Sequence, residues 1–153
     1  MANGIPDGYH ALTPSITVHD AAAAIEFYTR AFGAKEQFRL PMANGKIGHA
    51  ELVIGDSVFM LSDEFPDWGS VAPSTVGGTT GSLMLYVQDA DTVFAQALAA
   101  GAEEFMPLQD QFWGDRMGTV TDPFGHRWSI ATQVEAISPE ELEKRMKAFS
   151  EGA

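Results

Sequence analysis

The chain of 153 residues is long enough for one compact domain, or for two small halves that share a core. Its 9 Lys and Arg residues against 21 Asp and Glu residues give a net charge of −12. This charge excludes a surface that attracts phosphate backbones, so we expect no nucleic-acid partner, whereas a cationic small molecule is compatible with it. The lack of cysteine excludes disulfides, thiolate metal sites and a cysteine nucleophile.

The first residues, "MANGIPDGYHALT", lack the basic and apolar regions of a signal peptide. No apolar run approaches the length that is needed to span a membrane. We therefore expect a soluble cytoplasmic protein that has no membrane partner.

A pattern of one strand, one helix and three strands occurs twice along the chain. The first copy covers residues 9–62 and the second copy residues 82–133, within a single domain of residues 1–153. Each expected helix begins at an aspartate that can accept backbone N–H bonds, Asp20 or Asp89, and ends at a glycine, Gly33 or Gly101. After each helix come short strands with alternating polarity, and "DPFG" (122–125) suits a type I turn between the last two.

Residues 63–81 separate the two copies and are rich in Gly, Pro, Ser and Thr, which is typical of a linker. The simplest interpretation is a tether. The alternative is that Phe65 and Trp68 fold over a pocket as a lid.

Residues 138–150 follow the second copy and begin with Ser138, Pro139 and Glu141. These residues predict a capped amphipathic helix that packs on the body or on a second subunit.

The order of these elements, the spacing in "VHDAAAAIEFYTRAFGA" and the stretch "DPFGHRWSI" resemble the vicinal oxygen chelate superfamily, which includes glyoxalase I, bleomycin-resistance proteins and extradiol dioxygenases. The resemblance covers roughly residues 9–133 and is to a PhnB-like branch that has lost metal ligands. It implies an α+β fold in which two βαβββ modules form a curved mixed sheet around a cup. It also implies a homodimer, because this family commonly completes its cups by pairing modules or subunits.

In the enzymes of this family a divalent metal is held by four side chains, two from each module. The residues at the matching positions are Thr13, Met60, Ser82 and Ser129. Neutral hydroxyls are weak ligands, and a thioether prefers soft ions such as Cu(I). We therefore expect no metal at these four positions and no cofactor, and we expect all four residues to contact a ligand at the centre of the cup.

His49 and Glu51 stand two residues apart in a predicted strand and therefore share one face. Such a pair suits a metal or general acid–base chemistry, which makes both residues candidate catalytic groups, although two residues are an incomplete metal shell. The plainer alternative is a mutual hydrogen bond on a solvated strand face. A middle interpretation is that both side chains face the cup and contact a polar ligand.

The stretch "DQFWGDRMG" (110–118) places Trp113 and Arg116 at the entry to a strand that should border the cup. Tryptophan can stack on a planar ligand and arginine can clamp a carboxylate or phosphate. The alternative is that Trp113 plugs the interface between the modules while Asp115 and Arg116 pair locally. Tyr86 shares a strand face with Ser82 and is a further candidate for the pocket wall.

Two functions are compatible with these observations. The first is a metal-free protein that binds a small molecule and acts in resistance or sequestration. The second is a lyase, isomerase or dioxygenase that uses a relocated divalent metal or the His49–Glu51 pair. For the fold we expect the two modules to form one mixed, curved sheet surface with helices 20–32 and 89–100 on its outside. The expected core consists of Phe27, Tyr28, Phe32, Leu52, Ile54, Phe59, Leu85, Val87, Phe94, Leu98 and Ile130.

Overall fold

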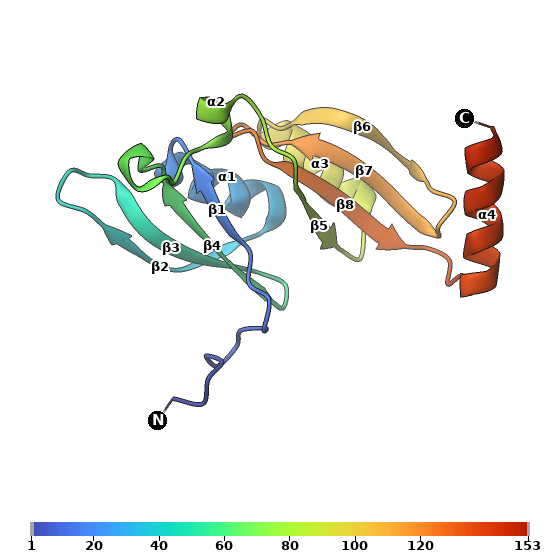
Figure 1. The fold of residues 1–153 in the computed structure, drawn as a ribbon, viewed down its shortest axis with the longest axis horizontal. Helices are drawn as coiled ribbons and strands as arrows, with labels where there is room; N and C mark the ends of the chain where they lie inside the picture. Colours follow the sequence, from blue (N-terminus) through green and yellow to red (C-terminus); the bar gives the residue numbers. More distant parts are fainter. Residues whose placement is uncertain (1, 153) are drawn as a thin grey trace.

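The structure is a computed structural model that describes residues 2–152, and it contains the βαβββ unit twice (Figure 1). The predicted α+β class is confirmed. The first unit consists of β1 (Ser15–Val18), α1 (Ala21–Phe32), β2 (Lys35–Pro41), β3 (Ile47–Ile54) and β4 (Ser57–Asp63). The second unit consists of β5 (Ser82–Tyr86), α3 (Ala90–Ala100), β6 (Glu103–Asp110), β7 (Asp115–Thr121) and β8 (Arg127–Gln133).

The strands form two mixed sheets of four instead of one hydrogen-bonded sheet, while the predicted pair of βαβββ modules is confirmed. The strand orders are β1-β4-β3-β2 and β5-β8-β7-β6, and in each sheet only the first pair is parallel. Side chains rather than a backbone ladder fill the seam between the two sheets. Trp128 in β8 packs on Phe32 and Tyr28 of α1, with ring centroids 4.7 and 5.2 Å apart. This aromatic contact joins the halves into one core.

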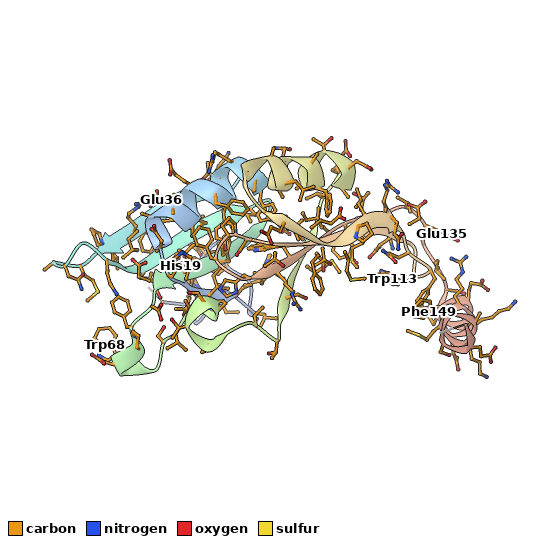
Figure 2. All side chains as sticks on the ribbon, turned by 90° about the horizontal axis from the view of Figure 1, so that it is seen from above. His19, Glu36, Trp68, Trp113, Glu135 and Phe149 are labelled. Atoms are coloured by element: carbon orange, nitrogen blue, oxygen red, sulfur yellow. The ribbon has the colours of Figure 1, made fainter. Side chains whose placement is uncertain are left out.

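Helices α1 and α3 pack against each other and cover the same side of both sheets, which leaves the other side without a helix layer (Figure 2). The predicted caps are confirmed. The carboxylates of Asp20 and Asp89 accept hydrogen bonds from the backbone N–H groups of Ala23 and Thr92, at 3.1 and 3.2 Å. Gly33 ends α1 with a φ of 66°, a left-handed conformation that favours glycine.

The core lies between the helices and the sheets. Six of the expected core residues are buried, namely Phe27, Tyr28, Leu52, Phe59, Phe94 and Ile130. Four others are half-buried and pack against this cluster, namely Phe32, Ile54, Leu85 and Val87. The prediction for Leu98 is wrong, because its side chain is 36% exposed. Trp128, which was not among the expected core residues, is almost fully buried.

The segment between the two units is not a plain coil. It holds a 3-10 helix, η1 (Pro66–Trp68), and one turn of α-helix, α2 (Pro73–Val76). Phe65 and Trp68 stack on each other at 5.0 Å, and Trp68 remains 74% exposed. Both rings line a cavity of about 300 Å³ beside Met42 and Lys46, and neither lines the two cavities between the units described below.

The last helix, α4 (Pro139–Glu151), stands apart from the sheets (Figure 1). It meets the body at the loop before β7, where the rings of Phe149 and Phe112 lie 5.0 Å apart and Arg145 donates a hydrogen bond of 3.1 Å to the Phe112 carbonyl. No residue of α4 is buried, and Leu142, Met146 and Phe149 are exposed. Between residues 2 and 152 no helix is both long and apolar enough to cross a membrane.

Candidate functional site

The helix-free face of the first sheet holds the His49–Glu51 pair. Ala50 and Leu52 of β3 are fully buried in the core, so strand alternation directs His49 and Glu51 to the opposite face. Glu51 lies opposite Phe38 of β2 and Met60 of β4 in the strand register. An imidazole, a carboxylate, an aromatic ring and a thioether therefore gather on one patch.

Glu51 is 6% exposed, and one of its oxygens, Oε2, lies 2.6 Å from His49 Nε2. The His49 side chain is 35% exposed and forms the outer part of the pair. The other carboxylate oxygen, Oε1, is buried without a hydrogen-bond partner. The mutual hydrogen bond considered in the sequence analysis is present, and it leaves the second carboxylate oxygen without a hydrogen-bond donor.

The helix-free face of the second sheet carries hydroxyl groups. Ser129 in β8 is buried and shares a 2.9 Å hydrogen bond with Thr119 of the neighbouring strand β7. Ser129 lies opposite Met84 of β5 in the register, and Ser82 stands at the start of β5. The expected alternation holds, because Ser82, Met84 and Tyr86 are exposed while Leu83 and Leu85 pack on the core.

At the end of this sheet the Asp115 carboxylate joins two of the candidate residues. Its Oδ2 accepts hydrogen bonds from the Tyr86 hydroxyl at 2.8 Å and from Trp113 Nε1 at 3.1 Å. The hydrogen bond to Asp115 raises the pKa of Tyr86 above its ordinary value. Asp115 is buried, and sequence reasoning had assigned it only local pairing with Arg116.

Arg116 lies on the other side of the second sheet. Its neighbours Asp115 and Met117 share the face of Ser129, and Arg116 instead binds Asp91 of α3 through two hydrogen bonds of 2.9 Å. A third contact, of 3.2 Å, reaches Asp110. With its donors engaged by two carboxylates on the helix side, Arg116 is poorly placed for the predicted role in ligand binding.

The four residues that the family resemblance matches to metal ligands offer no charged or imidazole ligand for a divalent ion. Thr13 precedes β1 and donates its hydroxyl hydrogen bond to the His10 carbonyl at 3.2 Å. Met60 lies in the strand that corresponds to the strand of Ser129, since β4 and β8 hold the same place in the two sheets. Hydroxyls and a thioether do not fit a hard divalent ion. The described chain also has no cluster of three or more His, Cys, Asp or Glu side chains that could hold one.

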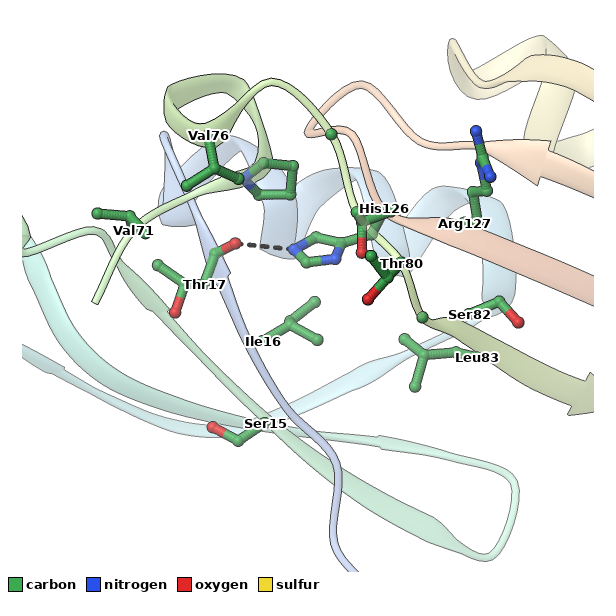
Figure 3. Close-up of a pocket in the computed structure, with 14 residues that line it drawn as sticks. Ser15, Ile16, Thr17, Val71, Val76, Thr80, Ser82, Leu83, His126 and Arg127 are labelled. Carbon is green, nitrogen blue, oxygen red and sulfur yellow. Dashed lines mark hydrogen bonds between the residues drawn. The ribbon is translucent and has the colours of Figure 1, made fainter. Parts of the chain in front are cut away.

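Two cavities follow the seam between the sheets. One, of about 490 Å³, lies between β1, the residues before β5 and the start of β8, and Figure 3 shows His126 at its centre. The His126 ring nitrogen Nε2 lies 2.8 Å from the Thr17 carbonyl and thus ties the two units together. The other cavity, of about 620 Å³, is lined mainly by apolar side chains, among them Leu12, Phe59 and Trp128.

The candidate residues therefore form separate groups. His49, Glu51 and Met60 lie together on the first sheet, and Tyr86 and Trp113 meet at Asp115 on the second. Ser82 lines the first seam cavity and Tyr86 the second. Arg127, which the sequence reasoning missed, lines the first cavity and lies 3.9 Å above the Phe105 ring. Arg127 stands two residues before Ser129 in "GHRWSI", so strand alternation places both residues on the same face. This spacing could have identified Arg127 as a candidate.

The fold, two βαβββ units with their helices on one side of the sheets, is the first indication of the protein family. Residues 9–130 match the model of the Glyoxalase/Bleomycin resistance protein/Dioxygenase superfamily, and the chain belongs to that family.

The chain is similar to several proteins of known sequence or structure. An uncharacterized protein of Mycobacterium tuberculosis H37Rv, Rv0887c, is 43% identical over 145 residues, which cover 93% of this chain and 85% of that protein. The crystal structure of TioX from Micromonospora sp. ML1 is 30% identical with a TM-score of 0.64, covering 81% and 98% of the two chains. The PhnB protein of Bacillus cereus has a TM-score of 0.63 over 80% and 99% of the chains, and at 21% identity this likeness concerns the fold alone.

Proposed function

We propose that the protein is a cytoplasmic homodimer that binds a small molecule without a metal ion, in a resistance or sequestration role. The proposal is supported by the side chains at the four positions that the family resemblance matches to metal ligands. Thr13, Met60, Ser82 and Ser129 provide hydroxyls and one thioether, which can contact a neutral or mildly polar group of a ligand. The net charge of −12 suits a cationic ligand.

A catalytic function is the second candidate, and one contact favours it. The 2.6 Å distance between His49 Nε2 and Glu51 Oε2 is the geometry of a base and the group that orients it. A lyase or isomerase reaction could use this pair, and a lyase, isomerase or dioxygenase could use a relocated metal beside it. A stoichiometric metal in the purified protein would favour this alternative over binding alone.

A thermal-shift screen of the protein after treatment with EDTA tests the binding function. A compound present at 100 times its Kd stabilises the folded state by about 2.7 kcal/mol, which corresponds to a rise in Tm of roughly 5–10 °C for a chain of this size. We expect such a rise with a small organic compound and no added metal.

Ser82→Trp should reduce the shift, because Ser82 lines the seam cavity, and Ser150→Trp on the exposed α4 is the control. A screen in which compounds act only after a divalent ion is added would contradict the proposal.

The homodimer rests on apolar side chains that the helix-free side leaves exposed. Phe38 and Leu40 are exposed on β2, Met84 and Tyr86 on β5, and Phe105 and Met106 on β6. Large exposed apolar side chains are typical of an interface or a binding site when they gather on one side of a protein. A second copy that covered this side would shelter these side chains from water.

Sedimentation velocity at micromolar concentration should show a dimer. Leu40→Asp should shift the equilibrium toward monomer, because the change places two carboxylates in an apolar interface. Ile5→Asp introduces the same charge at another exposed residue and should leave the dimer intact. A monomer at every concentration of the unmodified protein would contradict this prediction.

A further inference from the structure

Glu51 Oε1 is the one buried side-chain polar atom within residues 2–152 that lacks a hydrogen-bond partner. Buried carboxylates in folded proteins are almost always paired, because an ion that loses its water without gaining a partner destabilises the fold. The other oxygen of the same carboxylate is fully engaged by His49 at 2.6 Å. The unused oxygen therefore requires a donor that the described chain does not supply.

Glu51 Oε1 is itself shielded from solvent, but it lies on the helix-free face of the sheet and not in the core between the helices and the sheets. Glu51 is on the helix-free face of the first sheet, between Phe38 on one neighbouring strand and Met60 on the other. Phe38 is 42% exposed, and its ring lies 5.9 Å from the His49 ring. Methionine is flexible and adapts its shape to what it contacts, so Met60 can move aside without a backbone change.

We infer that Glu51 Oε1 is the acceptor for an N–H group of a protonated amine on the bound small molecule. This inference rests on the proposed binding function and deepens it by naming the group that the site recognises. His49 holds the carboxylate in place, and the faces of Phe38 and the Met60 thioether form the walls around the ammonium group.

Three features favour a protonated amine over other donors. A hydrogen bond between an ammonium N–H and a carboxylate oxygen is about twice as strong as one between neutral groups. The exposed ring of Phe38 attracts a cation through its face, which a hydroxyl group would not exploit. The chain as a whole carries 21 acidic against 9 basic side chains, so its field concentrates cations rather than anions.

Titrations with three small probes, followed by NMR of the labelled protein, test the inference. Benzylamine carries both the charge and the N–H group, benzyltrimethylammonium carries the charge alone, and benzyl alcohol carries a neutral donor. We expect benzylamine to bind most tightly and to shift the signals of Glu51 and its neighbours. Glu51→Gln should weaken benzylamine binding by about 10- to 150-fold, the range for loss of a charged hydrogen bond.

Glu143→Gln is the matched control, because it makes the same charge change on the exposed surface of α4 and should not alter benzylamine affinity. Phe38→Leu provides a second test if Glu51→Gln folds poorly. It keeps an apolar side chain at an exposed position and should weaken benzylamine by about 2- to 5-fold through the loss of the aromatic face.

Equal binding of benzylamine to the unmodified protein and to Glu51→Gln would overturn the inference, as would the absence of benzylamine binding. If benzyl alcohol or another neutral compound binds at the seam while benzylamine does not, the inference fails and the binding function stands. If Glu51→Gln changes only the dimer equilibrium, the donor belongs to a second copy of the chain and the inference also fails. If no compound binds at all, the proposed function fails with it.

Discussion

Asp122→Ala is expected to lower the free energy of unfolding by about 3–5 kcal/mol, the range for removing one partner from a buried charged network. The Asp122 carboxylate is buried and accepts hydrogen bonds from the Tyr28 hydroxyl at 2.5 Å and from Trp128 Nε1 at 3.0 Å. It also accepts from the backbone N–H groups of Phe124 and His126, each at 2.9 Å. Alanine would leave four buried or half-buried donors without a partner and would loosen the turn.

Chemical denaturation of Asp122→Ala beside Asp56→Ala measures this effect. Asp56 is exposed and accepts a hydrogen bond from the hydroxyl of the adjacent Ser57, so its removal should change stability by no more than about 0.5 kcal/mol. Tyr28→Phe removes one of the four donors and should fall between the two variants. Equal stability of Asp122→Ala and Asp56→Ala would show that the two units are not held together by this carboxylate.

The sequence predicted the turn around Asp122 but not the hydrogen bonds of Asp122 to distant residues. "DPFG" predicted a type I turn, and the Gly125 N–H does donate to the Asp122 carbonyl at 3.1 Å. Nothing in the turn indicated that the same aspartate would reach Tyr28 in the helix of the other unit. Capping and turn signals depend on neighbours within four residues, whereas the hydrogen bond to Tyr28 depends on how two separate units pack.

The candidate site shows the same division. Strand alternation predicted that His49 shares a face with Glu51, and that Ser82 shares one with Tyr86, because the period of two is a property of the strand itself. The contacts between residues of different strands could not be predicted from the sequence. Alternation alone did not reveal that Arg116 lies on the helix side, because that requires knowing that Val120 and Gly118 of the same strand pack beneath α3. The pairing of Tyr86 with Asp115 likewise joins β5 to β7, two strands that β8 separates.

Restoring the family ligands should create a metal response. In the variant that combines Thr13→His, Met60→Glu, Ser82→His and Ser129→Glu, two imidazoles and two carboxylates replace neutral groups that bind hard ions weakly. The variant alone should be less stable than the unmodified protein, because a carboxylate at the buried Ser129 loses the hydrogen bond to Thr119 and carries a charge into the interior. Zinc or manganese at 100 times its Kd should then raise the Tm by roughly 5–10 °C.

The variant with only Ser82→His and Ser129→Glu is the control for this response. Two ligands from one sheet form an incomplete site, so the increase with zinc should be small. If the four-residue variant folds and shows no response, the four positions do not meet at one centre, and their assignment from the family pattern is wrong.

The most direct test of the proposed metal-free site is the Tm of the unmodified protein in EDTA, in zinc and in manganese. The absence of a charged ligand at Thr13, Met60, Ser82 and Ser129 predicts the same Tm in all three conditions, because a ligand stabilises only a folded state that binds it. A gain of several degrees with either ion, lost in Glu51→Ala, would contradict metal-free binding and would place a relocated metal beside His49 and Glu51.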